Sequence, residues 1–125
     1  MYHEIIKLEW LSKEAKEAEL VVSDGINNCL VFSQPCSLRL GQVITEPLHA
    51  FDIENLMNVI DTEKYESINK TDESYFSYYC IARVIDKSKS IVSIGGIVIN
   101  LECQIPNWAY EGDLIEFKCS RLDIW

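Results

Sequence analysis

Histidine is scarce in this chain of 125 residues, which contains only His3 and His49. His3 is close to the N-terminus and is expected to be solvated. His49 precedes Asp52 and Glu54, a spacing in which a base or a metal ligand could meet carboxylates. No second cluster of ligands follows, and the sequence has no Ser-His-Asp pattern, nucleophile elbow, Walker-type loop or dinucleotide fingerprint. We therefore expect no catalytic residue, no metal site and no cofactor, and an enzymatic alternative would have to use the His49 region.

Long apolar runs are also missing, since none approaches the roughly 20 residues needed to cross a bilayer. Residues 1–19 are charged throughout and contain no signal-peptide core. These two features predict a cytoplasmic protein that does not contact a membrane.

Paired cysteine spacings are missing as well. The five cysteines are odd in number and widely separated, and no C-x-x-C occurs, so neither a disulfide framework nor a zinc ribbon is indicated. Cys80, Cys103 and Cys119 lie in strand-like runs and are expected to face inward as small apolar side chains. The full set expected to be free thiols is Cys29, Cys36, Cys80, Cys103 and Cys119.

Basic residues are few: 11 Lys and Arg stand against 20 Asp and Glu, which gives a net charge of −9. Such a chain repels the phosphates of nucleic acids and anionic membranes, and it attracts basic partners. Residues 46–73 form an acidic lobe in which eight carboxylates and two lysines give a net charge of −6. We therefore expect a basic protein as partner and regard nucleic acid as unfavourable. The eight carboxylates belong to Glu46, Asp52, Glu54, Asp61, Glu63, Glu66, Asp72 and Glu73.

What the chain does contain is a group of β-branched runs within residues 77–102. The runs 81–85 and 91–94 flank a short polar connection, and the run 97–101 follows Gly95-Gly96 directly. Paired glycines between apolar runs are typical of a two-residue hairpin in which both central residues have positive φ. The pattern predicts a three-stranded antiparallel meander.

Alternating apolar and polar residues predict further strands on both sides of this meander. The last of them should bend near residues 120–121, where the alternation changes phase. The expected segments are a strand over residues 4–11, a hairpin over 17–33, a strand over 38–44 that extends through 48–51, and a bent strand over 113–125.

The period changes after Asp52. Four apolar residues, Ile53, Leu56, Met57 and Ile60, fall at helical spacing behind this candidate N-cap, which predicts a helix of about two turns packed on the sheet. The polar and aperiodic residues 61–73 are expected to form an exposed loop.

Aromatic side chains crowd one strand entry in the pairs Tyr75-Phe76 and Tyr78-Tyr79. Adjacent strand residues point to opposite faces, so both members of a pair cannot enter one core. Some aromatic side chains should therefore be exposed, where they could anchor a protein, stack on bases, or form an edge without a role. These aromatic side chains and carboxylates of the expected loop 61–73 are the candidate partner-binding residues. The full set is Glu63, Glu66, Asp72, Glu73, Tyr75, Tyr79, Trp108 and Tyr110.

The expected order of three strands, a short helix and further strands resembles that of oligonucleotide/oligosaccharide-binding (OB) folds. The resemblance implies a mostly β chain in which residues 1–125 form a single small antiparallel OB-like barrel with one short helix. A β-sandwich is the alternative architecture.

In size, acidity and mixed β content the chain is similar to the immunity proteins that neutralise basic nuclease toxins. That likeness implies a non-catalytic, acidic protein-binding module with a basic nuclease as its partner. The alternative, implied by the OB resemblance, is a module that binds a small ligand or single-stranded nucleic acid through exposed aromatic side chains.

Overall fold

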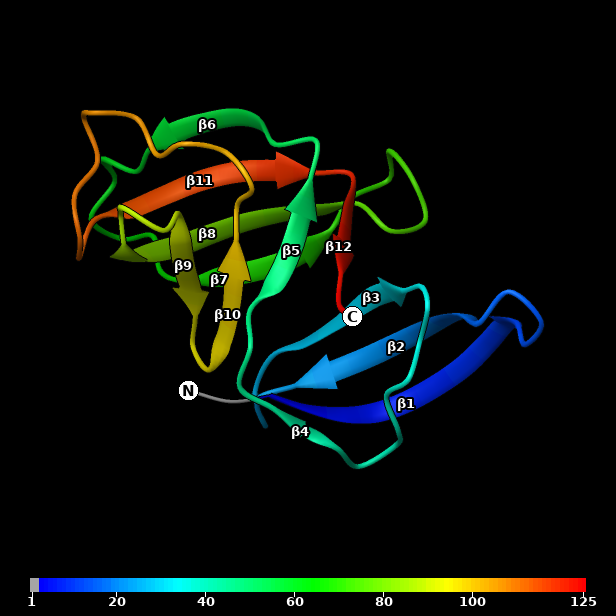
Figure 1. Ribbon diagram of the computed structural model, residues 1–125. Coiled ribbons are helices and arrows are strands. Elements are labelled where there is room, and N and C mark those ends of the chain that lie inside the picture. The colour runs from blue at the N-terminus through cyan, green and yellow to red at the C-terminus, as the bar shows by residue number, and fades with distance from the viewer. Residues whose placement is uncertain (1–2) are drawn as a thin grey trace.

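The computed structural model describes residues 3–125, of which 52% lie in strands and none in a helix (Figure 1). No helix of these residues is therefore long and apolar enough to cross a membrane. The strands are β1 (His3–Ser12), β2 (Glu17–Ser23), β3 (Asn28–Ser33), β4 (Val43–Ile44), β5 (Leu48–Phe51), β6 (Glu54–Asn58), β7 (Ser67–Lys70), β8 (Tyr78–Asp86), β9 (Ile91–Ile94), β10 (Ile97–Asn100), β11 (Leu114–Cys119) and β12 (Arg121–Asp123).

All twelve strands belong to one mixed sheet in the order β4-β1-β2-β3-β12-β5-β10-β9-β8-β11-β6, and β7 pairs with β8 beside this path. Two pairings, β5–β10 and β3–β12, are parallel, and the others are antiparallel. Figure 1 shows β1–β4 together at one end, β6, β8 and β11 at the other, and β5 and β12 between them. The prediction of a mostly β chain is confirmed. The predicted OB-like barrel is wrong, because the sheet is not closed, and no division into the two separate sheets of a sandwich is found.

The predicted meander is confirmed as β8, β9 and β10, with Ile94 opposite Ile97 across the two-residue turn. Gly95 has a φ of +59°, as a tight hairpin turn requires, but Gly96 is not among the residues with positive φ. The expectation of positive φ at both glycines is therefore wrong for Gly96.

The tip of this hairpin is bonded to the β2–β3 turn. The Gly96 N–H donates to Asp24 Oδ2 at 2.7 Å, while Asp24 Oδ1 accepts the N–H groups of Ile26 and Asn27 at 2.9 and 2.6 Å. One carboxylate thus closes its own turn and fixes the β9–β10 hairpin against it. A charged acceptor of this kind makes stronger hydrogen bonds than a neutral one.

The predicted helix over residues 53–60 is wrong, because this segment contains β6, which pairs with β11. Asp52 and Asn55 both have a φ of +56°, a left-handed conformation that an α-helix does not contain. Half of the expected packing face is nevertheless correct. Ile53 and Leu56 pack against the core, whereas Met57 and Ile60 are exposed.

Two further segments differ from expectation, and one agrees. Only Val43–Ile44 of the strand predicted over residues 38–44 is formed, and β7 lies within the predicted loop 61–73. The bend near residues 120–121 is confirmed, since β11 ends at Cys119 and β12 begins at Arg121.

The core is one contiguous cluster to which strands from both ends of the sheet contribute. In β11, for example, Ile115, Phe117 and Cys119 are buried, while the residues between them are partly exposed. Each large apolar side chain buried in this way contributes about 1.5–3 kcal/mol to folding. His3, which was expected to be solvated, is fully buried.

Candidate protein-interaction surface

Residues 52–65, which we call the acidic edge, form a largely exposed stretch of the described chain. It consists of β6 with its flanking residues, and none of its side chains is buried. Strand β6 ends the sheet and pairs with β11 on one side only. In Figure 1 it forms the upper border of the molecule. Its outer backbone groups are therefore available to a partner.

The side chains of the acidic edge combine negative charge with apolar surface. None of its carboxylates takes part in an ion pair within residues 3–125. Its single lysine, Lys64, is bonded to Glu116 of β11 at 3.1 Å. That bond, followed by a smaller contribution from Asp61, raises the pKa of Lys64, and Lys118 of β11 lies opposite Glu54 in the strand pair, so cations act on these two carboxylates without forming an ion pair with them. Met57, Ile60 and Tyr65 are exposed, Ile60 by 88%. The carboxylates belong to Asp52, Glu54, Asp61 and Glu63.

The outer face of β8 and β11, next to the acidic edge, carries three ion pairs. Because Ile115, Phe117 and Cys119 point into the core, Glu116 and Lys118 point to the opposite face. The pairs are Lys64–Glu116 at 3.1 Å, Arg83–Glu66 at 3.1 Å and Lys118–Glu73 at 2.8 Å.

Three of the predicted partner-binding residues meet on this face. Glu66 binds both Arg83 and the N–H of Gly95, and Glu73 binds Lys118. Tyr79 is half-buried and donates its hydroxyl to Glu116 at 2.9 Å. The charges of Glu66 and Glu73 are thus matched within the chain, which leaves them less available to a partner than the carboxylates of the acidic edge.

The other predicted residues lie apart from one another. Glu63 belongs to the acidic edge, and Asp72 is exposed in the connection between β7 and β8. Tyr75 is exposed in the same connection, but its hydroxyl donates to Glu19 of β2 at 3.1 Å. Trp108 and Tyr110 are exposed in the connection between β10 and β11, where Lys87 Nζ lies 4.4 Å from the Tyr110 ring centroid. Exposure of aromatic side chains is confirmed, but they do not form one platform with the acidic residues.

The carboxylate partner of His49 is neither Asp52 nor Glu54. His49 Nδ1 contacts Glu102 Oε1, and its ring stacks on Trp125 with centroids 4.0 Å apart. Glu102 has a φ of +56°, and its N–H donates to Asn100 Oδ1 at 2.8 Å. The spacing that suggested a site around His49 therefore joins residues that are not bonded to each other in the structure.

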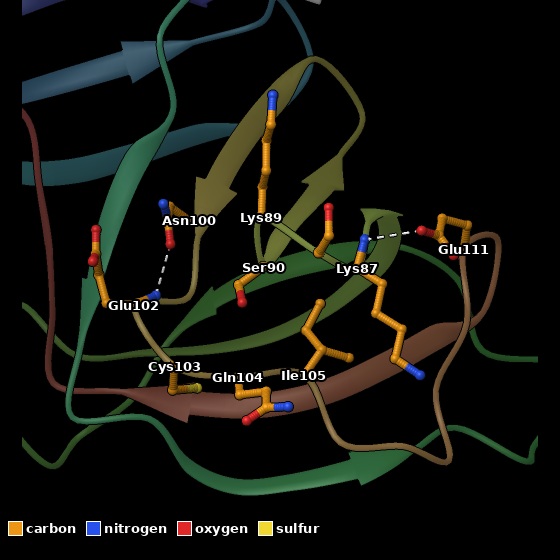
Figure 2. Close-up of a pocket in the computed structure, with 10 residues that line it drawn as sticks. Lys87, Lys89, Ser90, Asn100, Glu102, Cys103, Gln104, Ile105 and Glu111 are labelled. Atoms are coloured by element: carbon orange, nitrogen blue, oxygen red, sulfur yellow. Dashed lines mark hydrogen bonds between the residues drawn. The ribbon is translucent and has the colours of Figure 1, made fainter.

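A hollow of about 780 Å³ lies between the β8–β9 connection and the segment that follows β10. Figure 2 shows Lys87, Lys89 and Ser90 on one side and Cys103, Gln104 and Ile105 on the other. The Lys87 ammonium donates to the Asn107 carbonyl at 3.2 Å, and the Lys87 N–H donates to Glu111 at 3.1 Å. Charges of both signs line this hollow, and it carries no cluster with an evident chemistry.

The thiols give no metal site either. All five cysteines are free; four are buried, and Cys103 is exposed rather than facing inward as expected. Contact with Cys119, followed by burial, raises the pKa of Cys80 well above its ordinary value, and burial raises that of Cys29. Buried thiols held in the protonated form are poor nucleophiles and poor metal ligands. In residues 3–125 no group of three or more His, Cys, Asp or Glu is arranged to hold a metal ion.

Met57 and Ile60 point outward, although their helical spacing predicts that both belong to a packing face. Asp52 and Asn55 were the residues from which a departure from the helix could have been predicted, since Asp and Asn adopt the left-handed conformation more readily than most residues. Comparisons of the chain with models of known protein families, with curated proteins and with solved structures find no match.

Proposed function

We propose that this chain is a non-catalytic module that binds a basic protein through the acidic edge. The observation that carries the proposal is the combination found there: an open strand edge, apolar side chains in solvent and carboxylates that form no ion pair within residues 3–125. Protein interfaces combine an apolar centre with a charged rim in this way. Exposed apolar side chains grouped together mark such surfaces more often than isolated ones do.

Charge favours a basic partner over other classes. The chain has a net charge of −9, and the acidic edge holds the carboxylates of Asp52, Glu54, Asp61 and Glu63 against one lysine, Lys64, which is itself paired with Glu116. A field of this sign accelerates encounter with a cationic protein and repels a phosphate backbone. The similarity in size and acidity to immunity proteins makes basic nucleases the first partner class to test.

The binding residues in this proposal differ in part from those expected from the sequence. Glu63 is kept, and Glu54, Asp61, Met57 and Ile60 join it. Glu66 and Glu73 become supporting residues, because breaking their ion pairs with Arg83 and Lys118 would accompany any direct contact. A carboxylate that is already paired within the chain gains less free energy from contact with a cationic partner than an unpaired carboxylate does, because its existing ion pair must first be broken.

The test is a binding screen against a panel of basic nucleases and other basic proteins, with single-stranded oligonucleotides measured in parallel. We expect binding to a basic protein with an association rate that falls as salt rises. The double substitution Asp61→Lys with Glu63→Lys should lower this association rate about tenfold or more. Ile60→Ser should instead raise the dissociation rate, because it removes an apolar contact.

A matched control changes the same amount of charge elsewhere. Glu14 and Glu46 are exposed and lie outside the acidic edge, so the double substitution Glu14→Lys with Glu46→Lys should reduce the rate much less. Equal effects of the two double substitutions would show that net charge, not the acidic edge, governs association. Tight binding of oligonucleotides at physiological salt would refute the proposal and favour the nucleic-acid alternative.

A further inference from the structure

Strand β1 leaves a second edge of the sheet open. On one side it pairs with β2 along most of its length, from Glu4 to Ser12. On the other side β4 pairs with His3 and Glu4, and Ile5 exchanges hydrogen bonds with Gly41 and Gln42. Within residues 3–125, no backbone pairs with 7–11 on that side, and in Figure 1 β4 runs beside the N-terminal part of β1 only.

This open part of β1 is rich in exposed apolar side chains. Ile6, Trp10 and Leu11 are exposed by 45%, 41% and 51%, and Leu8 is partly buried against the core. A long, apolar and unpaired edge is a template for pairing with another strand. Bulges protect many natural edges, but here the register shifts fall at Ile6 and Leu11, on either side of residues 7–10, which pair regularly with β2 and contain no bulge.

The charges of this edge are complementary to a second copy of itself. Lys7 and Glu9 lie on one face of β1, with Lys7 Nζ 3.2 Å from Glu9 Oε1, and Leu8 lies between them on the other face. In an antiparallel pair of identical strands with Leu8 opposite its counterpart, Lys7 of each copy lies opposite Glu9 of the other. The same register brings Ile6 beside Trp10 of the other copy.

The registers on either side of this one are less favourable. In two antiparallel copies of one strand, the numbers of any two facing residues add up to the same sum. Facing residues must point to the same face of the sheet, so this sum is even, and one residue therefore faces its own counterpart at the two-fold axis. Moving the axis to Glu9 places two carboxylates against each other and leaves Lys7 opposite Leu11. Moving it towards Ile5 is prevented, because the backbone of Ile5 is already bonded to Gly41 and Gln42.

We propose that two copies of this chain associate through β1, antiparallel about a two-fold axis at Leu8, so that the sheet continues from one copy into the other. The cross-strand pairs Lys7–Glu9 fix the register, and the apolar side chains of Ile6, Leu8 and Trp10 supply the buried surface. This surface is at the opposite end of the strand order from the acidic edge, so a dimer leaves the acidic edge free.

The test is the oligomeric state of the whole chain, measured by sedimentation equilibrium in at least 0.15 M salt so that the net charge of −9 on each copy is screened. We expect a reversible dimer whose population rises with concentration. Lys7→Glu and Glu9→Lys should each weaken association about tenfold, because both cross-strand pairs then carry like charges. In an equimolar mixture of the two variants, both pairs are again of opposite charge, and association should recover.

Recovery in the mixture is a result that a structural role of Lys7 or Glu9 in the single chain would not produce. Thermal melts of both variants check the fold, which should be nearly unchanged because an exposed ion pair contributes little to stability. A monomer at every concentration up to about 1 mM would overturn the proposal, because even a dissociation constant of about 1 mM would populate the dimer there. So would a dimer that neither variant weakens, or variants that do not recover on mixing.

Discussion

Replacing Gly95 with alanine tests whether the β9–β10 hairpin is held by the carboxylate of Asp24. A Cβ atom at Gly95 would lie 2.6 Å from Asp24 Oδ2 and 3.0 Å from Asn27 Nδ2. The Asp24 side chain cannot simply rotate away, because its two oxygens accept three backbone N–H groups, including that of Gly96. The substitution should therefore displace the hairpin tip or break its hydrogen bond to Asp24.

The expected loss has two parts. A left-handed φ for alanine costs about 1 kcal/mol, and losing a hydrogen bond to a charged acceptor costs about 1.5–3 kcal/mol. The free energy of unfolding should thus fall by about 3 kcal/mol in total.

Gly25 provides a control that separates strain from contact. Its φ is +97°, and a Cβ there would meet nothing within 4 Å. Strain alone would make Gly25→Ala the worse substitution, because a φ of +59° lies in the left-handed region that other residues tolerate best, whereas +97° lies outside it. The contact with Asp24 predicts the reverse order, with Gly95→Ala lower in stability by about 1–2 kcal/mol, or roughly 4–8 °C in Tm.

Equilibrium unfolding in urea, followed by circular dichroism, measures both variants. A third variant, Asp24→Ala, removes the clash, so Gly95→Ala added to it should cost only the strain of about 1 kcal/mol. If Gly25→Ala were as destabilising as Gly95→Ala, or if Gly95→Ala cost the same with and without Asp24, the reasoning would be refuted.

Two further predictions concern side chains whose burial differs from expectation. Burial lowers the pKa of His3 below its ordinary value of 6.5 in the folded protein, so the unfolded chain binds more protons at mildly acidic pH. The free energy of unfolding should be highest above the pKa of unfolded His3 and fall as the pH drops towards the folded pKa, by at most about 1.4 kcal/mol per pH unit. Urea unfolding between about pH 5.5 and 7.5 should show a smaller pH dependence in His3→Phe. The same pH dependence in both proteins would contradict this prediction. Cys103 is the one exposed cysteine of the five, so a maleimide should add once. Partial burial of its thiol raises the pKa above the ordinary value, so the reaction should be slower than with a free cysteine. Intact mass after brief treatment of the folded protein gives the number of adducts, and two or more would show that a buried thiol is accessible.

The strands that sequence patterning located correctly are those with one face in the core. Residues 17–33 and 113–119 alternate between buried and partly exposed positions, and the pattern of side chains reports that alternation directly. The meander was found because its strands are short, apolar and joined by a turn whose glycine is required at Gly95. Free thiols and the acidic balance also followed from the residues alone.

Local patterning failed where pairing with distant strands decided the conformation. The apolar spacing from Ile53 to Ile60 fits a helix, but the segment pairs with β11, about 60 residues later in the chain, and reaches that position through left-handed residues. Closure into a barrel likewise depends on which strands meet. The parallel pairings β5–β10 and β3–β12 join segments far apart in sequence, and the sheet that contains them is open.

For the interaction surface, the sequence determined how much negative charge the chain carries and roughly where it lies. Only the tertiary structure decided which carboxylates are free: Arg83 and Lys118, from β8 and β11, match Glu66 and Glu73, while Glu63 has no cationic neighbour within bonding distance. It also decided that β6 and β1 are left with open edges. The physical reason is that composition and periodicity report on each residue and its near neighbours, whereas ion pairs and strand edges depend on which distant segments the folded sheet brings together.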